Sequence, residues 1–357
     1  MEGKTLGIIG GGQLGQMTTM AASKMGVKTV IFTDIDGSPA AREANTVIVA
    51  DYGDCKALQE FADSCDAITY EFENIPAESV ELLEKTGKIN PSAKILRITQ
   101  NRILEKTFLN EIGIKTANFF EIRSENGLKR GFLEFGKSIL KTATLGYDGK
   151  GQFVIENEVD IGDIWREIEA QGLNKHGLVL EKFCPFESEA SAIVARSLNG
   201  EISCYDPLTN VHKDGILDKS FYPAHISSDC ARNIKEIAVK IAEKTGLFGL
   251  LAIEFFILEG GELIVNEMAP RPHNSGHFSM DASETSQFEQ LILAVFGEKL
   301  GDVSFHSHGY MQNLIGDEVL NLTEYENDEN ARVHVYGKSE VKQGRKMGHI
   351  NNITPQT

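Results

Sequence analysis

The sequence predicts a mixed α/β and α+β protein with three parts: an N-terminal doubly wound parallel-sheet domain, a small lid domain and a larger C-terminal sheet domain. Three observations predict this. Strands and helices alternate over the first hundred residues, a glycine-rich loop separates two later strands, and an apolar hairpin follows residue 249. Alternation is typical of parallel sheets covered by helices, whereas a hairpin belongs to an antiparallel sheet. The expected boundaries are 1–104, 105–182 and 183–357.

Composition narrows the functional class. The chain has 357 residues, of which 41% are hydrophobic, and a formal net charge of −17. That charge argues against nucleic acid or an anionic membrane as a partner, since both need a cationic surface. The five cysteines include no Cys-x-x-Cys pair, and an odd number suits a reducing compartment. Neither a signal peptide nor a membrane span is visible, so we expect a cytoplasmic enzyme.

The first domain carries a glycine-rich turn. Strands are expected at Thr5–Ile9, Val27–Phe32, Thr46–Val49 and Ala67–Tyr70. The turn after the first strand, Gly10–Gly15, matches the dinucleotide fingerprint G-x-G-x-x-G, and Asp34 follows at about the expected distance. Taken alone, this pattern indicates an NAD-dependent oxidoreductase. The same glycines are needed wherever a strand turns tightly into a helix, so that function is kept as the alternative.

A helical stretch, Ile95–Leu109, leads into the second domain. There a strand from Phe135 to Lys141 and a strand from Phe153 to Glu156 enclose a loop with three glycines. Such a loop can wrap phosphate groups with its backbone N–H groups, and lysines flank it, so we interpret it as a lid over a nucleotide. The alternative is an ordinary glycine-bearing hairpin.

The third domain begins at a proline. An apolar strand, Leu178–Pro185, breaks there, which indicates a hinge between lid and body. A larger sheet region is expected to begin with Glu187–Ser197, and a helix is expected at Asp229–Thr245. The last stretch, His334–His349, is basic, unlike the acidic remainder of the chain.

The hairpin formed by Leu250–Leu258 and Leu263–Ala269 carries one carboxylate on each apolar strand. A turn centred on Gly260-Gly261 places Glu254 directly opposite Glu267. Two like charges at that spacing destabilise a sheet unless a cation lies between them. Mg²⁺ usually takes one or two carboxylates and completes its shell with water and phosphate oxygens, so the pair predicts a metal–nucleotide site. The alternative is a pair of solvated positions on an edge.

Taken together, these segments resemble the ATP-grasp ligases over nearly the whole chain, and the fold implied is the ATP-grasp fold. The resemblance is specific to the carboxylating branch of purine biosynthesis. It is carried by Gly11–Gly15, Thr69–Glu73, Gly146–Gln152, His212–Leu217, Asn266–His277 and Gly344–His349.

The resemblance implies a two-step reaction. ATP, held with Mg²⁺ or Mn²⁺, phosphorylates bicarbonate to carboxyphosphate, which then carboxylates the amine of 5-aminoimidazole ribonucleotide; ADP and phosphate leave. Partners are expected to be these small molecules and, as in relatives, a second copy of the chain in a homodimer. A third hypothesis is a non-catalytic assembly partner that keeps the fold.

The resemblance also implies roles for individual residues. The metal ligands are Glu254 and Glu267, and the catalytic residues are Asp148, Arg271 and His273. ATP would contact Arg102, Lys141, Gly146, Tyr147, Asp148, Gly149, Lys150, Gly151, Gln152, Glu181, Lys182, Phe183, Cys184, Glu189, His212, Asn266 and Glu267. The ribonucleotide would contact Gln13, Glu73, Tyr147, Lys150, Asn274, Lys338, Arg345 and Lys346.

Several of these residues have simpler interpretations. Glu73 could cap a helix near Pro76, Tyr147 could only pack, and Lys346 and His349 could be ordinary surface or capping residues. Asp148 could accept the proton of the amine or only orient it.

Three positions also depart from the family pattern. Many relatives have proline at Lys137, aspartate at Asn101 and arginine at Lys150, and lysine cannot form the planar fork of arginine.

Overall fold

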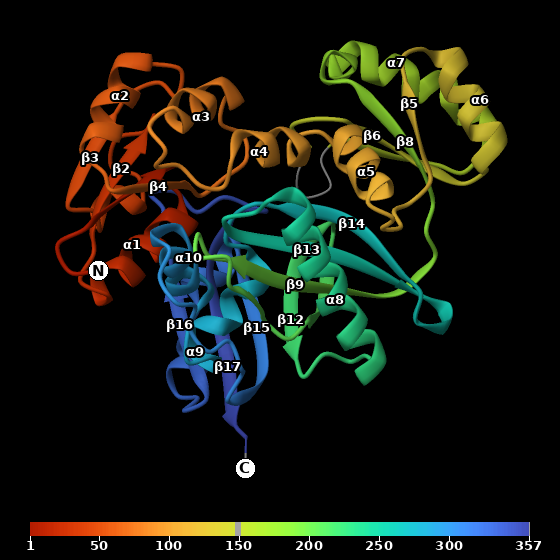
Figure 1. Ribbon diagram of the computed structural model, residues 1–357. Helices are drawn as coiled ribbons and strands as arrows, with labels where there is room; N and C mark the ends of the chain where they lie inside the picture. The colour runs from red at the N-terminus through yellow and green to blue at the C-terminus, as the bar shows by residue number, and fades with distance from the viewer. Residues whose placement is uncertain (147–150, 357) are drawn as a thin grey trace.

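The computed structural model describes residues 1–146 and 151–356. Within these residues the strands form three sheets, which Figure 1 shows as an N-terminal part in red and orange, a lid in yellow and green, and a body in green to blue. This is the predicted mixed fold. The boundaries at residues 104 and 182 stay a prediction. No helix in the described part of the chain is both long and apolar enough to cross a bilayer.

The N-terminal sheet is parallel, with the strand order β3-β2-β1-β4. The order changes direction between β1 and β4, so the turns after these two strands meet at the carboxyl edge of the sheet, where α/β proteins bind ligands. Those turns hold residues 10–12 and 71–73. The elements are β1 Thr5–Ile9, α1 Gln13–Lys24, β2 Lys28–Thr33, β3 Thr46–Val49, α2 Cys55–Asp63, β4 Ala67–Tyr70, α3 Ala77–Glu84 and α4 Ala93–Thr99.

The lid is an antiparallel sheet in the order β5-β8-β6-β7, with two helices of its own. Its core is separate from the rest, because Leu128, Ile155, Ile168 and Leu180 are fully buried among other lid residues. The elements are α5 Arg102–Glu111, which leads into the lid, β5 Phe119–Ile122, α6 Glu125–Phe135, β6 Ser138–Thr142, β7 Gln152–Ile155, α7 Ile161–Gln171 and β8 Leu178–Lys182.

The body is a large antiparallel sheet in the order β14-β13-β9-β11-β12-β15-β17-β16, with β10 paired to β9. One hydrophobic core joins it to the N-terminal part, since Leu14 and Met17 of α1 share a cluster with Phe288 and Leu291 of α10. The elements are β9 Phe186–Arg196, β10 Ile202–Cys204, β11 Leu208–Lys213, β12 Ile216–Tyr222, α8 Ser228–Thr245, β13 Gly249–Leu258, β14 Leu263–Ala269, α9 Ser279–Ala282, α10 Gln287–Phe296, β15 Ser307–Ile315, α11 Thr323–Glu326, β16 Ala331–Val335 and β17 Lys346–Pro355.

Three predicted elements were wrong in their bounds; one is the strand expected over Leu178–Pro185, which ends at Lys182. The helix expected over Ile95–Leu109 is two helices, because the Asn101 side chain accepts hydrogen bonds from the backbone N–H groups of residues 103 and 104 and starts α5 there. The strand expected from Phe135 begins at Ser138, since Phe135 is the last residue of α6 and Gly136 ends that helix with φ +66°.

The turn of the acidic hairpin also differs from the prediction. The backbone N–H of Leu258 donates to the carbonyl of Glu262 at 2.9 Å, so the strands are joined by the three residues Glu259–Gly261. A symmetric two- or four-residue loop was expected. The odd number of turn residues shifts the strand pairing near the turn by one position.

Candidate functional site

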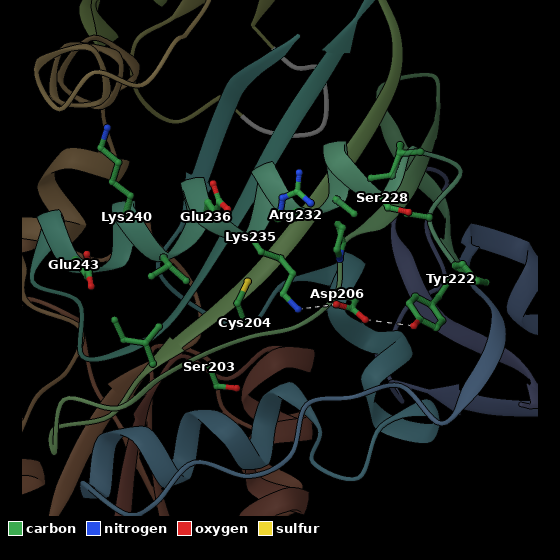
Figure 2. Close-up of a pocket in the computed structure, with 17 residues that line it drawn as sticks. Ser203, Cys204, Asp206, Tyr222, Ser228, Arg232, Lys235, Glu236, Lys240 and Glu243 are labelled. Atoms are coloured by element: carbon green, nitrogen blue, oxygen red, sulfur yellow. Dashed lines mark hydrogen bonds and ion pairs between the residues drawn. The ribbon is translucent and has the colours of Figure 1, made fainter. Parts of the chain in front are cut away.

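A cavity of about 640 Å³ lies where the N-terminal sheet, the lid and the body meet. A larger hollow of about 980 Å³ lies beside α8. Figure 2 shows an ion pair on the wall of that hollow: Lys235 Nζ lies 2.7 Å from Asp206, which also accepts a hydrogen bond from the Tyr222 hydroxyl at 3.4 Å. The smaller cavity is the candidate site, because charged groups from all three parts of the fold converge on it.

Most of the predicted site residues line this cavity. They are Gln13, Glu73, Arg102, Lys141, Gly146, Gln152, Glu189, His212, Glu254, Asn266, Glu267, Arg271, His273, Asn274 and Lys346. The other predicted residues that the structure describes are not on its wall: Gly151, Glu181, Lys182, Phe183, Cys184, Lys338 and Arg345. The predictions for Tyr147, Asp148, Gly149 and Lys150 fall outside the described residues.

The two glutamates do face each other. Glu254 on β13 and Glu267 on β14 are register partners, although Phe255 pairs with Val265 one step nearer the turn. Asn266 is therefore the extra residue of a β-bulge, and the bulge corrects the one-residue shift that the turn introduces. Neighbouring residues on a regular strand point to opposite faces. Because of the bulge, Asn266 and Glu267 both line the cavity.

The electrostatics of this pair favour a cation. Burial, together with the negative charge of Glu267, raises the pKa of Glu254 to about 8. His273 Nε2 lies 3.2 Å from Glu254 Oε1. Burial and the nearby charge of Arg271 hold the pKa of His273 well below its usual range. Since His273 Nδ1 accepts from the backbone N–H of Ser275, the neutral ring carries its proton on Nε2, the nitrogen that lies toward Glu254.

The donor set fits a hard divalent ion. Two carboxylates and the amide oxygen of Asn266 are oxygen ligands, which Mg²⁺ prefers. In the described part of the chain no group of three or more His, Cys, Asp and Glu side chains is arranged to hold a metal. A cation at Glu254 and Glu267 would thus depend on water and phosphate oxygens for its remaining ligands.

Helix α5 holds the metal-site strand from outside. β14 is an edge strand, so its outward backbone groups need partners from elsewhere. The buried Glu105 carboxylate accepts from the backbone N–H of Met268 at 2.7 Å, and the buried Lys106 donates to the carbonyl of Asn266 at 3.2 Å. These bonds lie on either side of Glu267. Burial, with the charge of Glu267, raises the pKa of Glu105 to about 8.

A buried ion group underlies the lid side of the cavity. Glu181 Oε2 lies 2.9 Å from Lys141 Nζ, and its Oε1 lies 3.2 Å from Lys106 Nζ. Burial alone would raise the pKa of Glu181, but the two ammonium groups outweigh it and lower the pKa to about 2. Two ammonium groups against one carboxylate leave a net positive charge, and Lys141 presents it to the cavity.

Arg102 ties the lid loop to the metal-site strand. Its guanidinium donates to the carbonyls of Thr142 and Gly146 at 3.2 and 3.1 Å, and one nitrogen lies 3.8 Å from Glu267 Oε2. Across the cavity, His212 Nδ1 lies 2.6 Å from Glu189 Oε2. Burial would lower the pKa of His212, yet the carboxylate of Glu189 raises it overall. The Glu189 carboxylate thus favours the protonated form of this ring, which lies on the same cavity wall as the acidic pair.

An arginine–glutamate fork joins the N-terminal part to the body. Both Arg271 Nε and Nη2 donate to the carboxylate of Glu73, the latter at 3.0 Å. Burial would raise the pKa of Glu73, but Arg271 outweighs it and lowers that pKa. The capping alternative for Glu73 is wrong, because α3 follows Pro76 with no side-chain cap.

The basic tail contributes unevenly. Lys346 lines the cavity, whereas Lys338 donates to the carbonyl of Lys346 at 2.6 Å and Arg345 donates to the carbonyl of Glu340 at 3.3 Å. His349 is fully buried and shares a hydrogen bond of 2.8 Å with the Tyr336 hydroxyl, so the surface interpretation of His349 is wrong.

Comparison with known protein families also divides the chain into three parts. Three family models match: a ribonucleotide synthetase preATP-grasp domain over residues 3–100, an ATP-grasp domain over 107–288 and a phosphoribosylaminoimidazole carboxylase C-terminal domain over 309–357. The N5-carboxyaminoimidazole ribonucleotide synthase of Brucella melitensis biotype 1 is 45% identical over 356 residues, covering 99% of this chain and 98% of the relative. The chain belongs to the N5-carboxyaminoimidazole ribonucleotide synthase family.

Solved members of this synthase family have the same fold. The Staphylococcus aureus N5-carboxyaminoimidazole synthetase complexed with ADP matches with a TM-score of 0.93 at 38% identity, over 99% of this chain and 94% of that chain. The Aspergillus clavatus synthase in complex with ADP and 5-aminoimidazole ribonucleotide matches with a TM-score of 0.91 at 27% identity, over 99% and 94%. Nothing in these comparisons supports the oxidoreductase alternative.

Two buried glutamates on the cavity wall, Glu71 and Glu105, were not predicted as site residues from the sequence. Also not predicted was an aromatic pair on the wall, Phe186 and Phe256, whose ring centroids lie 4.5 Å apart. A signal for Glu105 existed, since charged residues rarely lie within an apolar helix face unless they are paired. No such signal marked the phenylalanines, which are ordinary core residues in sequence.

Proposed function

We propose that the protein catalyses the family reaction, the ATP-dependent carboxylation of 5-aminoimidazole ribonucleotide on its amine. The observation that carries the proposal is the face-to-face pair Glu254 and Glu267 on a cavity that all three parts of the fold line. The names of the relatives, which are N5-carboxyaminoimidazole ribonucleotide synthases, support the choice of substrate. The glutamate pair supports the use of a triphosphate.

In the first step a bicarbonate oxygen attacks the γ-phosphorus of ATP, and the bond from that phosphorus to ADP breaks. Glu254 and Glu267 would hold Mg²⁺, which would supply positive charge to neutralise the phosphates. Lys141 would add positive charge from the lid side, and Arg271 and His273 would hold bicarbonate and then carboxyphosphate. Phosphoryl transfer needs positioning and charge neutralisation more than covalent help, which suits these residues.

In the second step the substrate amine attacks the carboxyl carbon of carboxyphosphate, phosphate leaves and the amine loses a proton. The Asn274 amide favours a ligand here, because both of its polar atoms are buried and without a hydrogen-bond partner among the described residues. A buried unpaired amide costs free energy, so a bound ligand that satisfies it gains affinity. Asp148, Tyr147, Lys150, Lys338 and Arg345 are proposed as the further substrate contacts.

The nucleotide would lie with its triphosphate at the acidic pair. Glu189 is proposed to bind the ribose, and the backbone of residues 182–184, after Glu181, to read the adenine edge. The stacked Phe186 and Phe256, with Ile139, form an apolar wall suited to a base.

We also propose bicarbonate as the carbon source, Mn²⁺ as a replacement for Mg²⁺, a homodimer and a cytoplasmic location. All five cysteines are free thiols, which supports a reducing compartment.

A phosphate-release assay tests the proposal. We expect phosphate release to require ATP, Mg²⁺, bicarbonate and 5-aminoimidazole ribonucleotide together, and to fall by at least about 100-fold in Glu267→Gln. Glu262→Gln, an exposed carboxylate of the same hairpin, is the matched control. Full activity of Glu267→Gln would contradict the metal assignment. Activity that does not depend on the ribonucleotide would contradict the substrate. A thermal-shift titration with NAD and with MgATP tests the rejected alternative, because a bound ligand raises the melting temperature.

A further inference from the structure

The glycine turn after β1 has the form of an anion-binding site that is already filled. The Glu71 carboxylate accepts a hydrogen bond from the backbone N–H of Gly12 and, through its other oxygen, one of 2.6 Å from the N–H of Gly15. These two N–H groups open helix α1. In dinucleotide-binding folds, the N–H groups at this place bind the pyrophosphate. Here they bind a carboxylate of the same chain.

The glycines of the fingerprint are required by this carboxylate. A Cβ on Gly12 would lie 2.7 Å from Glu71 Oε1, and a Cβ on Gly10, whose φ is +113°, would clash with the Glu71 side chain. Gly15 is limited mainly by the backbone, since its Cβ would lie 3.0 Å from the carbonyl oxygen of Gly10 and 3.4 Å from Glu71 Cδ. The motif that predicted a dinucleotide is thus explained by close approach of Glu71, with no nucleotide needed.

Glu71 is placed to act on the substrate cavity. It is 7% exposed, and it lines the cavity beside Gly12, Gln13 and Leu14. Burial raises its pKa, and the two backbone N–H groups, followed by the charge of Arg271, act against that shift. Its backbone N–H donates to the carbonyl of Ile9 at 3.0 Å, so the residue is fixed between β1 and β4.

We propose that Glu71 is a positioning residue, an internal anion that fixes the glycine turn so that Gln13 can meet the ribonucleotide, and that bars nucleotide phosphates from the N-terminus of α1. The inference rests on the proposed function for its substrate. It assigns the dinucleotide-like motif to binding of 5-aminoimidazole ribonucleotide and not to binding of ATP.

Chemical rescue tests this. Glu71→Ala removes the carboxylate and leaves a space of its size beside two N–H groups. We expect KM for 5-aminoimidazole ribonucleotide to rise at least tenfold, while KM for ATP changes less than threefold. Acetate should lower the raised KM and increase the melting temperature of this variant, whereas neutral acetamide at equal concentration should do neither. Sodium chloride controls for ionic strength.

Glu84→Ala is the matched control, because the Glu84 carboxylate also accepts from a backbone N–H, that of Ala93 at 2.9 Å, but lies away from the cavity. It should lose stability without a change in either KM, and acetate should have no effect specific to it. If Glu71→Ala does not fold, Glu71→Gln keeps the shape but loses the charge and one acceptor, and its KM for the ribonucleotide should also rise.

Three results would overturn the inference: an unchanged ribonucleotide KM in Glu71→Gln, equal KM increases for both substrates in Glu71→Ala, or equal effects of acetate and acetamide on its melting temperature. The melting-temperature readout needs no turnover. Failure of the proposed function, seen as wild-type protein without ribonucleotide-dependent phosphate release, is therefore distinguishable from failure of the role of Glu71.

Discussion

At the scale of single residues, the site contains carboxyls whose burial conflicts with ionisation. Glu254 and Glu105 both have a pKa raised to about 8, and both lie close to Glu267. A residue type that is costly to bury is usually present for function. For Glu254 the cost would be relieved by the proposed cation, and for Glu105 it is offset by a hydrogen bond from the backbone of β14.

The first prediction concerns pH and Glu254. Its folded-state pKa of about 8 lies above the ordinary value of 4.5, so the folded state keeps a proton that the unfolded state releases. Without metal, stability should therefore fall as pH rises from about 4.5 to 8 and level off above. Glu254→Gln lacks this loss and should be more stable than wild type at pH 9, by about 1–2 kcal/mol, although inactive. Thermal unfolding between pH 5 and 9 in EDTA measures it.

Glu262→Gln serves as the control, because that carboxylate is exposed on the same hairpin and should leave the pH profile unchanged. Addition of Mg²⁺ at pH 9 should stabilise wild type and not Glu254→Gln. An identical pH slope in wild type and Glu254→Gln would show that Glu254 titrates normally.

The second prediction concerns Glu105. Glu105→Ala leaves the buried N–H of Met268 without a partner, which costs about 1–3 kcal/mol, and it frees the strand beside Glu267. Stability should fall and KM for MgATP should rise. Glu105→Gln keeps an acceptor and should lose less than about 1 kcal/mol. Urea unfolding measures the stability of the two variants, and steady-state kinetics measures their KM for MgATP. Equal stability and equal KM in Glu105→Ala and Glu105→Gln would mean that the hydrogen bond is unimportant.

At the scale of elements, helix α5 sets part of the site from outside the sheet. It is capped by Asn101, begins at Arg102, and holds β14 through Glu105 and Lys106. The helix start is thus coupled to the nucleotide site.

The third prediction follows from the start of α5. Asn101→Ala removes two capping hydrogen bonds and should destabilise the protein by about 0.5–2 kcal/mol. Because Arg102 follows the cap directly, KM for ATP should also rise. Asn101→Asp keeps the acceptor and adds a negative charge at a helix N-terminus, so its stability should equal or exceed that of wild type. Thermal unfolding and ATP kinetics provide the measurement. An unchanged KM for ATP in Asn101→Ala would show that the helix cap does not affect ATP binding.

The elements also show what sequence could predict. The alternation of strands and helices gave the parallel sheet, and the apolar hairpin gave the acidic pair, because both depend on local periodicity. The bulge at Asn266 was not predictable. The three-residue turn and the bulge shift the register by one residue in opposite directions, so Glu254 still pairs with Glu267, as it would with a symmetric turn and no bulge. The Glu73–Arg271 fork was likewise missed as a contact, since it joins residues 198 positions apart.

At the scale of the whole molecule, the cores divide differently from the sheets. One cluster joins α1 of the N-terminal part to α10 of the body, whereas the lid keeps a cluster of its own. Shared burial couples the first two parts, whereas an opening of the lid would leave their shared core buried.

The fourth prediction tests that division by hydrogen exchange. In wild type the lid should exchange through openings of lower free energy than those of the N-terminal part and the body. Phe288→Ala, in the shared core, should cost about 3–5 kcal/mol and speed exchange in both of those parts. Ile168→Ala, in the lid core, should speed exchange in the lid alone. Uniform acceleration by Ile168→Ala would show that the lid is not an independent unit.

The position of β14 at the border of its sheet has a wider consequence. A catalytic strand in the middle of a sheet is locked by two neighbours, so any adjustment disturbs the whole ladder. β14 has a strand on one side; on the other it has side chains of helix α5 and a single backbone bridge from residues 115 and 116. Remodelling that helix face offers a way to tune cation affinity in small steps while the remaining strands keep their alignment.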